Sequence, residues 1–371
     1  MRRKFFKNLD WIILIIPIIL SVIGIISIYS ATFQIGLDEF YKQLKWIGIG
    51  IIFLLIFTII DYEEISKYGI VGYIIINILL IAVLFMPARS GARSWFSFGS
   101  FLLQPAEIGK IFYIIFISNY ISKIQVRSSD EINKFWKLIS TLILAVIPII
   151  LIIIQPDYGT ALVFVISLFF ILLLAGIKKR YIFLGMIFSG IILFMLFSFI
   201  LPKYAPHAIR RFNIFLNPEI DPRGDGYNTI QSKIAVGSGK IFGMGFKEGT
   251  QTQLGYLHPK TTDFIFSVIS EEMGFAMSAF IVILYTILVS RIFIIAKTSK
   301  DKLGSYIAGG IGTIFLFHVF QNIGMTIGLM PITGIPLPFL SYGGSSTITN
   351  FALIGLALNI SARRKRTILG E

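Results

Sequence analysis

Long apolar runs alternate with short polar turns along most of the chain, and each run has the length of a membrane-crossing helix. Roughly 20 residues are needed, because an α-helix rises about 1.5 Å per residue and the hydrocarbon core is about 30 Å thick. The pattern predicts an all-α integral membrane protein, a bundle of ten transmembrane helices; a re-entrant short span would change that number by one. Their predicted bounds are 11–30, 44–60, 68–86, 106–122, 137–154, 159–176, 181–201, 264–291, 304–330 and 346–361.

One polar segment interrupts this pattern between the seventh and eighth predicted spans. Residues 202–262 contain basic residues, turn formers and repeated glycines in place of an apolar run, and 230–236 is expected to be a short amphipathic helix at the membrane interface. The segment ends just before Asp263, so a carboxylate stands where the chain re-enters the membrane. No separate soluble domain is predicted: residues 1–371 form one polytopic membrane domain, with 202–262 as its large loop.

The distribution of Lys and Arg predicts how the bundle is oriented. In membrane proteins, the cytoplasmic connections carry an excess of these residues. Placing both ends of the chain in the cytoplasm puts twenty Lys and Arg residues in the inside segments and four in the short outside loops. Both termini are therefore predicted to be cytoplasmic, and the 202–262 loop extracytoplasmic.

Composition excludes several other classes of protein. The chain is 56% hydrophobic and 14% charged, which a soluble domain could not bury. Its net charge of +14 is scattered between the spans, so it indicates orientation and contact with anionic headgroups rather than nucleic-acid binding. The chain has no cysteine, which excludes disulfides, thiol catalysis and thiolate metal sites. The first span lacks a small-residue cleavage site and is expected to be a retained anchor.

Charged residues at the outer ends of the spans are the first candidates for chemistry, because ionisable groups inside a membrane are costly. Glu107 and Lys110 are neighbours on one helix face. They are predicted either to form a structural ion pair or to place Lys110 as a counter-charge for a substrate phosphate. Asp157 lies at an outer turn, where it caps the sixth helix or joins a site. Arg210 and Arg211 follow the seventh span. Their side chains are predicted either to snorkel to the lipid headgroups or to bind a diphosphate.

Acidic residues around the start of the eighth span form a second group. Asp263 combines a span-edge position with a long polar approach, although a carboxylate at a helix start also serves as an N-cap. Glu271 and Glu272 follow two turns deeper and need partners within the bundle or a proton. His318, inside the ninth span, is expected to be a hydrogen-bonded core residue.

Two segments resemble motifs of the SEDS family (shape, elongation, division and sporulation proteins), which includes RodA and FtsW. Residues 322–346 read NIGMTIGLMPITGIPLPFLSYGGSS and resemble the family signature. Gly-Thr-Gln-Thr-Gln-Leu at 249–254, with Thr-Asp-Phe-Ile-Phe at 262–266, resembles the large-loop motif in a form more similar to RodA than to FtsW. Smaller matches cover nearly the whole chain: Gln104-Pro105-x-Glu107 with Lys110, Gln155-Pro156-Asp157-x-Gly159-Thr160, and Gly226-Tyr227-Asn228 with Gln231-Ser232-Lys233.

The chain departs from the family pattern just before Asp263. Members similar to RodA usually show Leu-Pro-Glu-x-His-Thr-Asp, whereas residues 257–263 here read Leu-His-Pro-Lys-Thr-Thr-Asp. The usual glutamate and histidine are absent, so no role is assigned to either.

The resemblance implies a peptidoglycan glycosyltransferase that joins the disaccharide units of lipid II at the outer membrane surface. It assigns the catalytic carboxylate to Asp263, as the base that takes the proton from the acceptor hydroxyl. A diphosphate leaving group needs charge neutralisation and no proton, unlike the leaving group of the paired-carboxylate glycosidases. The other predicted site residues, all for substrate binding, are Glu107, Lys110, Asp157, Arg211, Lys233, Gln251 and Ser341.

The same resemblance implies partners, a cofactor and a location. It predicts a divalent cation (Mg or Mn) with no organic cofactor, a class B penicillin-binding protein and other elongation-complex proteins as partners, and a place in the bacterial cytoplasmic (inner) membrane. No metal ligands are assigned. A lipid II flippase, a division or sporulation role, and a non-catalytic scaffold for a transpeptidase are the alternative functions.

Overall fold

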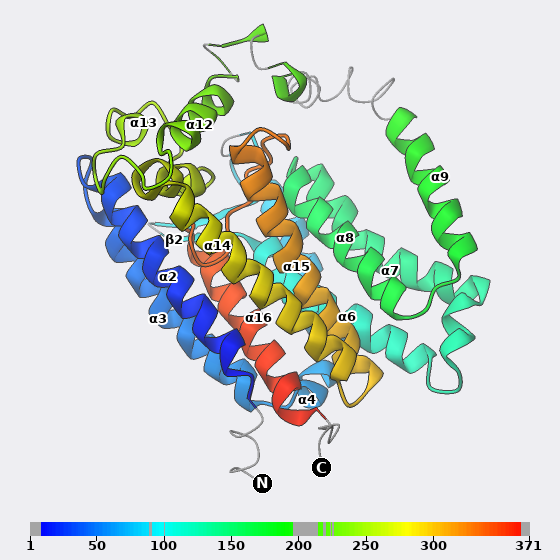
Figure 1. Cartoon of the computed structure of the whole chain (residues 1–371). Helices are drawn as coiled ribbons and strands as arrows, with labels where there is room; N and C mark the ends of the chain where they lie inside the picture. Colours follow the sequence, from blue (N-terminus) through cyan, green and yellow to red (C-terminus); the bar gives the residue numbers. More distant parts are fainter. Residues whose placement is uncertain are drawn as a thin grey trace.

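The computed structural model describes residues 9–88, 91–99, 101–195, 214–217, 220–222, 224 and 226–364. Within these residues, ten helices correspond in order to the ten predicted spans, and most of them stand side by side in one bundle (Figure 1). They are α2 (Trp11–Thr32), α3 (Asp38–Ile59), α5 (Gly69–Ala82), α6 (Pro105–Ile124), α7 (Phe135–Ile154), α8 (Tyr158–Leu174), α9 (Lys179–Met195), α14 (Ile265–Thr298), α15 (Lys302–Thr326) and α16 (Gly344–Arg363).

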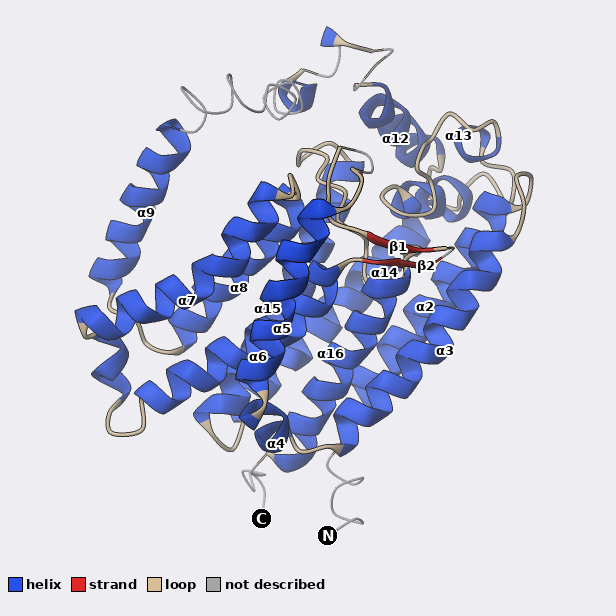
Figure 2. Ribbon diagram, turned by 180° about the vertical axis from the view of Figure 1, so that it is seen from behind, coloured by secondary structure: helices blue, strands red, loops and turns tan. Residues whose placement is uncertain are grey.

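Shorter elements connect these helices. They include the hairpin of β1 and β2, in which Phe96 pairs with Leu103, and α12, which is longer than the helix expected at 230–236 (Figure 2). Their bounds are α4 (Tyr62–Lys67), η1 (Val83–Phe85), β1 (Phe96–Phe98), β2 (Phe101–Leu103), η2 (Ser129–Asn133), α12 (Tyr227–Ser238) and α13 (Thr250–Gln253).

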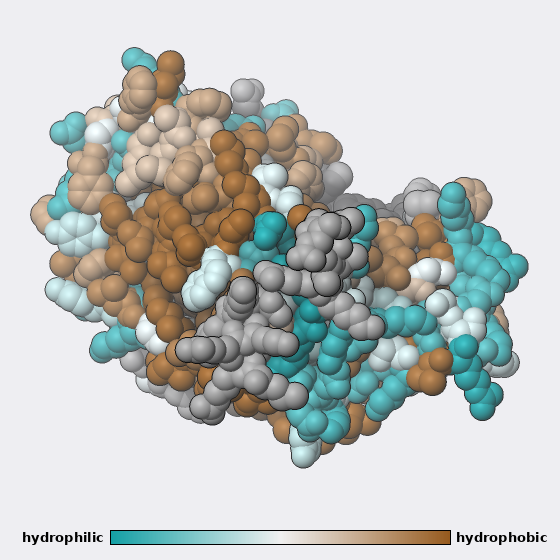
Figure 3. Space-filling model, turned by 60° about the horizontal axis from the view of Figure 1, so that its bottom comes forward, coloured by the Kyte–Doolittle hydropathy of each residue, from teal (hydrophilic) through white to brown (hydrophobic). Residues whose placement is uncertain are grey.

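The helices have the length and surface of a multi-pass membrane protein. In the described part of the chain, α2, α3, α7, α14, α15 and α16 are long and apolar enough to cross a bilayer, and α5 with η1 and α8 are shorter apolar helices. Broad hydrophobic surface lies beside hydrophilic residues at the end where α2 begins and α16 ends (Figure 3). Helices α12 and α13 lie at the opposite end (Figure 1), as expected for a loop that follows seven predicted spans. The number of crossings and their orientation stay predictions.

Helix α16 forms the centre of the bundle. In its most apolar window, 94% of the residues are buried. Its close approach to α3 depends on Gly355, where a Cβ atom would lie 2.3 Å from the carbonyl oxygen of Leu54. Small residues of this kind let two helix backbones pack tightly when no hydrophobic force drives helices together inside a bilayer.

The chain between α15 and α16 turns back into the bundle as a non-helical segment, residues 331–342, here termed the re-entrant segment. A Cβ atom on Gly24, midway along α2, would lie 2.8 Å from Cα of Leu340. The hydroxyl of Tyr285 in α14 donates to the carbonyl of Pro338. Irregular backbone is tolerated at this depth because protein groups satisfy its hydrogen bonds. Helix α15 therefore ends at Thr326, earlier than the predicted span.

Helix α14 is interrupted at Gly274, whose φ of 75° and ψ of −173° are not helical. A non-helical segment of the large loop, residues 240–245, enters the break and restores the lost hydrogen bonds. The four bonds run from Met244 N to Glu271 O (2.9 Å), Gly245 N to Glu272 O (3.1 Å), Phe275 N to Lys240 O (2.9 Å) and Ala276 N to Ile241 O (3.0 Å). The predicted eighth span thus consists of two helical pieces, 265–273 and 275–298.

Replacing Gly274 by alanine should destabilise the protein. Its backbone lies in a region that is essentially restricted to glycine, which costs other residues about 1–3 kcal/mol. The new Cβ atom would also lie 2.2 Å from the backbone nitrogen of Gly243. We expect a lower unfolding temperature in detergent for Gly274→Ala. Gly237→Ala is the control, because a Cβ there meets nothing within 4 Å; equal unfolding temperatures for the two variants would contradict this account of the break.

Candidate functional site

Asp263 lies in a turn immediately before α14, with the side chain half-buried. The N-cap position of α14 is Phe264, one residue later, and no side chain hydrogen bond is made from that position. Three consecutive carbonyls around Asp263 accept hydrogen bonds from α15 and the re-entrant segment. The donors are Tyr342 N to Thr261 (2.9 Å), Ser341 Oγ to Thr262 (2.6 Å) and Asn322 Nδ2 to Asp263 (3.0 Å). The backbone that carries the carboxylate is therefore fixed from the side of the bundle.

Two of these donors serve several backbone groups at once. The buried Ser341 hydroxyl also accepts a hydrogen bond from Leu337 N (2.8 Å), so its observed bonds position the backbone; substrate binding by Ser341 stays a prediction. Asn322 Nδ2 also donates to Ile335 O (2.8 Å), and among the described residues its buried Oδ1 has no hydrogen-bond partner. Sequence reasoning placed Asn322 in the signature without a role, and its amide is one of the groups that hold Asp263.

The re-entrant segment connects Asp263 to a second polar cluster. A Cβ atom on Gly334, where φ is +70°, would lie 3.7 Å from Oδ2 of Asp263, so the segment faces this carboxylate. Two residues further on, the carbonyl of Pro336 accepts a hydrogen bond from Nδ1 of His318 (3.1 Å). The segment thus touches both the catalytic candidate and the interior of α15.

Glu107 and Lys110 form the ion pair that their spacing predicts, inside the bundle. Lys110 Nζ lies 2.5 Å from Glu107 Oε1 and 3.0 Å from Nε2 of His318, and both charged residues are only 2% exposed. Because His318 donates from Nδ1 to Pro336, its Nε2 is the acceptor for the lysine ammonium. His318 is a satisfied core residue, as expected, but sequence reasoning missed its contact with Lys110. Among the described residues, Glu107 Oε2 has no hydrogen-bond partner.

Asp157 caps a helix and also links two others. Its Oδ1 accepts from the backbone N–H of Thr160 (3.2 Å), which confirms the capping interpretation for α8. Its Oδ2 accepts from Nε2 of Gln104 (2.7 Å), the residue that precedes α6. Burial raises the pKa of the Asp157 carboxyl. Asp157 is therefore joined to the same end of α6 that carries Glu107 and Lys110.

Glu271 and Glu272 have the partners that burial demands, and those of Glu271 come from the large loop. Its carboxylate accepts from the turn at 250–252: Gln251 N (2.7 Å), Thr252 N (3.0 Å), Thr252 Oγ1 (2.7 Å) and Thr250 Oγ1 (3.4 Å). Glu272 accepts from Ser30 Oγ (2.6 Å) in α2 and from Gln253 Nε2 (3.1 Å). In the described structure, the buried Oε1 of Gln251 has no hydrogen-bond partner.

The remaining predicted cations lie in the large loop. Lys233 is an exposed residue of α12, and its side chain covers Gly328, where a Cβ atom would meet Lys233 Cε at 1.9 Å. Ser232 fixes this helix by donating to the carbonyl of Thr326 (2.8 Å) at the end of α15. Arg211, with Arg210, lies outside the described residues.

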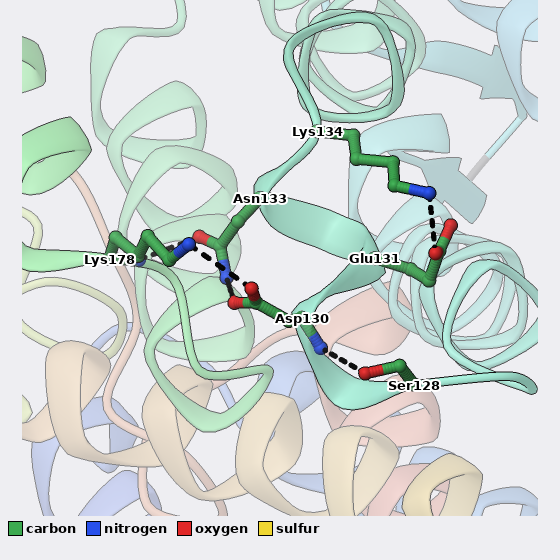
Figure 4. Close-up of a pocket in the computed structure, with 6 residues that line it drawn as sticks. All are labelled: Ser128, Asp130, Glu131, Asn133, Lys134 and Lys178. Atoms are coloured by element: carbon green, nitrogen blue, oxygen red, sulfur yellow. Dashed lines mark hydrogen bonds and ion pairs between the residues drawn. The ribbon is translucent and has the colours of Figure 1, made fainter.

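A polar pocket at the far end of the bundle is not part of this site. It has a volume of about 280 Å³ and lies around η2 and the start of α9 (Figure 4). Its charged groups neutralise one another: Lys178 lies 3.1 Å from Asp130, and Lys134 lies 2.6 Å from Glu131. Among the residues that the structure describes, no group of three or more His, Asp or Glu side chains could hold a metal ion.

Known proteins resemble this chain along nearly its whole length. The family model named for FtsW, RodA and SpoVE, described as cell cycle protein, matches residues 8–366. Stage V sporulation protein E of Bacillus subtilis is 35% identical over 368 residues, which cover 95% of this chain and 96% of that protein. Peptidoglycan glycosyltransferase MrdB of Escherichia coli K12 is 35% identical over 360 residues, which cover 96% of this chain and 95% of that protein.

A solved structure supports the same relationship. It concerns structural coordination of polymerization and crosslinking by a peptidoglycan synthase complex, and it aligns with a TM-score of 0.79 and 27% identity over 95% of this chain and 97% of that chain. A sporulation protein and MrdB are equally identical to this chain, so these two matches identify the family without separating its branches. The chain belongs to the FtsW, RodA and SpoVE family of cell cycle proteins, as its sequence motifs predict.

Proposed function

We propose that this protein is a peptidoglycan glycosyltransferase that polymerises lipid II, with Asp263 as the general base. The observation that supports this role is the setting of Asp263. Its backbone is held by hydrogen bonds to three successive carbonyls, while its side chain remains half-buried at the end of the large loop. A base needs a fixed position and access to substrate, and the fully buried Glu271 and Glu272 lack that access.

The proposed reaction is an inverting displacement at the anomeric carbon of the lipid-linked donor. The acceptor sugar hydroxyl attacks that carbon, its proton passes to Asp263, and the bond to the diphosphate breaks with both electrons leaving on the phosphate oxygen. The leaving diphosphate then needs positive charge nearby. Lys233 is an exposed candidate, Lys110 is a buried one, and Arg211 is the third predicted cation.

We include a divalent cation (Mg or Mn) in the proposal because the resemblance to the family implies one. Mg²⁺ is commonly held by one or two carboxylates together with substrate phosphate oxygens, and does not need an all-protein cage. A cation bound mainly by diphosphate oxygens would need few protein ligands, and no ligand is assigned to it here. When bound, it would neutralise charge on the leaving group.

The wider role that we propose is cell elongation in the cytoplasmic (inner) membrane of a bacterium. The Gly-Thr-Gln form of the 249–254 motif favours it over division or sporulation. A class B penicillin-binding protein is the proposed partner, since the aligned structure concerns polymerization and crosslinking in one complex. Depletion of the protein should give round cells under the microscope. Filamentous cells would indicate division instead.

Asp263→Asn should abolish polymer formation. The amide keeps the shape of the carboxylate but has no basicity, and loss of a general base typically costs about 10²–10⁴-fold in rate. Purified protein with its partner would be given lipid II, and the products resolved on a gel. Asp38→Asn, an exposed carboxylate at the start of α3, is the control and should retain activity. Full-length polymer from Asp263→Asn would disprove the proposed base. Lipid II transport without any polymer from the native protein would favour a flippase.

The Glu107–Lys110 pair should show a distinct stability pattern. Removing one partner of a buried ion pair leaves an uncompensated charge and costs about 3–5 kcal/mol, whereas replacing both is far milder. Lys110→Met should therefore lower the unfolding temperature more than Glu107→Gln/Lys110→Met does. If Lys110 also neutralises the diphosphate, the stable double variant should remain inactive. Native activity in that variant would restrict Lys110 to a structural role.

A further inference from the structure

Lys260 is a buried cation only three residues before Asp263, in the stretch where the chain departs from the family pattern. Its residue exposure is 8%, and its Nζ donates to the carbonyl of Thr252 at 2.9 Å. An ammonium is costly to remove from water unless protein groups compensate it. Burial lowers the pKa of Lys260, while the carboxylates of Glu272 and Glu39 act in the opposite direction.

Thr252 is held between this cation and an anion. Its carbonyl accepts from Lys260, while its backbone N–H and its hydroxyl donate to Oε2 of Glu271 at 3.0 Å and 2.7 Å. Thr252 and Glu271 are both fully buried. The backbone N–H, the hydroxyl donor and the carbonyl of Thr252 thus each have a charged partner, and charge-assisted hydrogen bonds are stronger than neutral ones.

These contacts close a ring that contains Asp263. From Asp263, the first piece of α14 leads to Glu271; the carboxylate of Glu271 binds Thr252; the carbonyl of Thr252 binds Lys260; and three residues later the chain returns to Asp263. The three carbonyl contacts from α15 and the re-entrant segment hold this turn from the bundle side. The ring holds it from the loop side.

We propose that Lys260 is a positioning residue for Asp263, acting through the carbonyl of Thr252 and the carboxylate of Glu271. The ring fixes the backbone at 257–263, so that the carboxylate of Asp263 stays beside Gly334. Its kinetic consequence rests on the proposed function of Asp263, but the ring itself does not. The two are therefore tested by separate measurements.

The first experiment measures the reactivity of individual lysines in the purified full chain, using a small amine-acetylating reagent and mass spectrometry. Lys260 should react at least about tenfold more slowly than the exposed Lys240 of the same loop, because it must open before it reacts. Glu271→Gln should raise the rate at Lys260 several-fold and leave Lys240 unchanged. Equal rates at the two lysines in the native chain, or no response of Lys260 to Glu271→Gln, would overturn the ring, whatever activity the protein has.

The second experiment separates positioning from substrate binding by polymerisation kinetics. Lys260→Met should lower kcat about 10- to 100-fold with KM within about twofold, because a displaced base slows the chemical step. Lys240→Met is the matched control and should behave as the native protein. Lys260→Arg, which keeps the charge, should recover part of kcat. A higher KM at unchanged kcat, or native kcat in Lys260→Met, would refute positioning.

A double-variant cycle tests whether the two charges act through the same turn. If Lys260 and Glu271 both act on Thr252, then Lys260→Met/Glu271→Gln should lose little more kcat than the worse single variant, whereas independent effects would multiply. Multiplicative losses would contradict the ring. Should Lys260→Met fail to fold, Thr252→Val provides the second measurement. It removes only the hydroxyl donor to Glu271, and it should lower kcat and raise the acetylation rate of Lys260; native values for both would refute the proposal.

Discussion

Inside a bilayer, each interruption of a helix exposes N–H and C=O groups that water cannot reach, and the whole site depends on how this chain satisfies them. The break at Gly274 is filled by the loop segment 240–245, and the re-entrant segment is held by side chains of α14 and α15. Each irregular piece therefore provides the hydrogen bonds that another piece needs. As a result, a large polar loop is joined to the bundle with enough order to hold a carboxylate in place.

Buried charge follows from the same constraint. Glu271 and Glu272 lie beside the break in α14, and donors from the loop and from α2 surround them. A carboxylate in such a place stabilises the fold only if its hydrogen bonds are made, because its desolvation is otherwise uncompensated. The acid pair therefore makes the position of the Gly-Thr-Gln turn part of the stability of α14. Any displacement of that turn would leave the buried carboxylate of Glu271 without its donors.

Much of the fold could be predicted from the sequence, because apolar runs of membrane-spanning length are a strong signal. The ten predicted spans coincide with helices to within a few residues at most ends. The break at Gly274 was not predicted, since a glycine inside an apolar run does not reveal its φ angle. The ninth span was predicted to continue to residue 330, whereas α15 ends at Thr326. The re-entrant segment itself was not predicted, although Pro331, Pro336 and Pro338 indicate non-helical backbone. Contacts between residues far apart in the sequence, such as Lys110 with His318, could not be predicted, because no short sequence pattern accompanies them.

For the candidate site, the resemblance pointed to Asp263, and the surrounding geometry gives a physical reason to prefer it over the other acids. Glu107 is paired with a lysine, Asp157 caps a helix, and Glu271 binds the loop backbone. Each is committed to holding the structure together, and a carboxylate used in this way is a poor base because moving it or protonating it would cost stability. Asp263 is in addition fixed through its main chain, because Asn322 donates a hydrogen bond to its backbone carbonyl. A contact through the main chain fixes the position of a residue whatever its carboxylate does, and a fixed position is what a general base at a membrane surface requires.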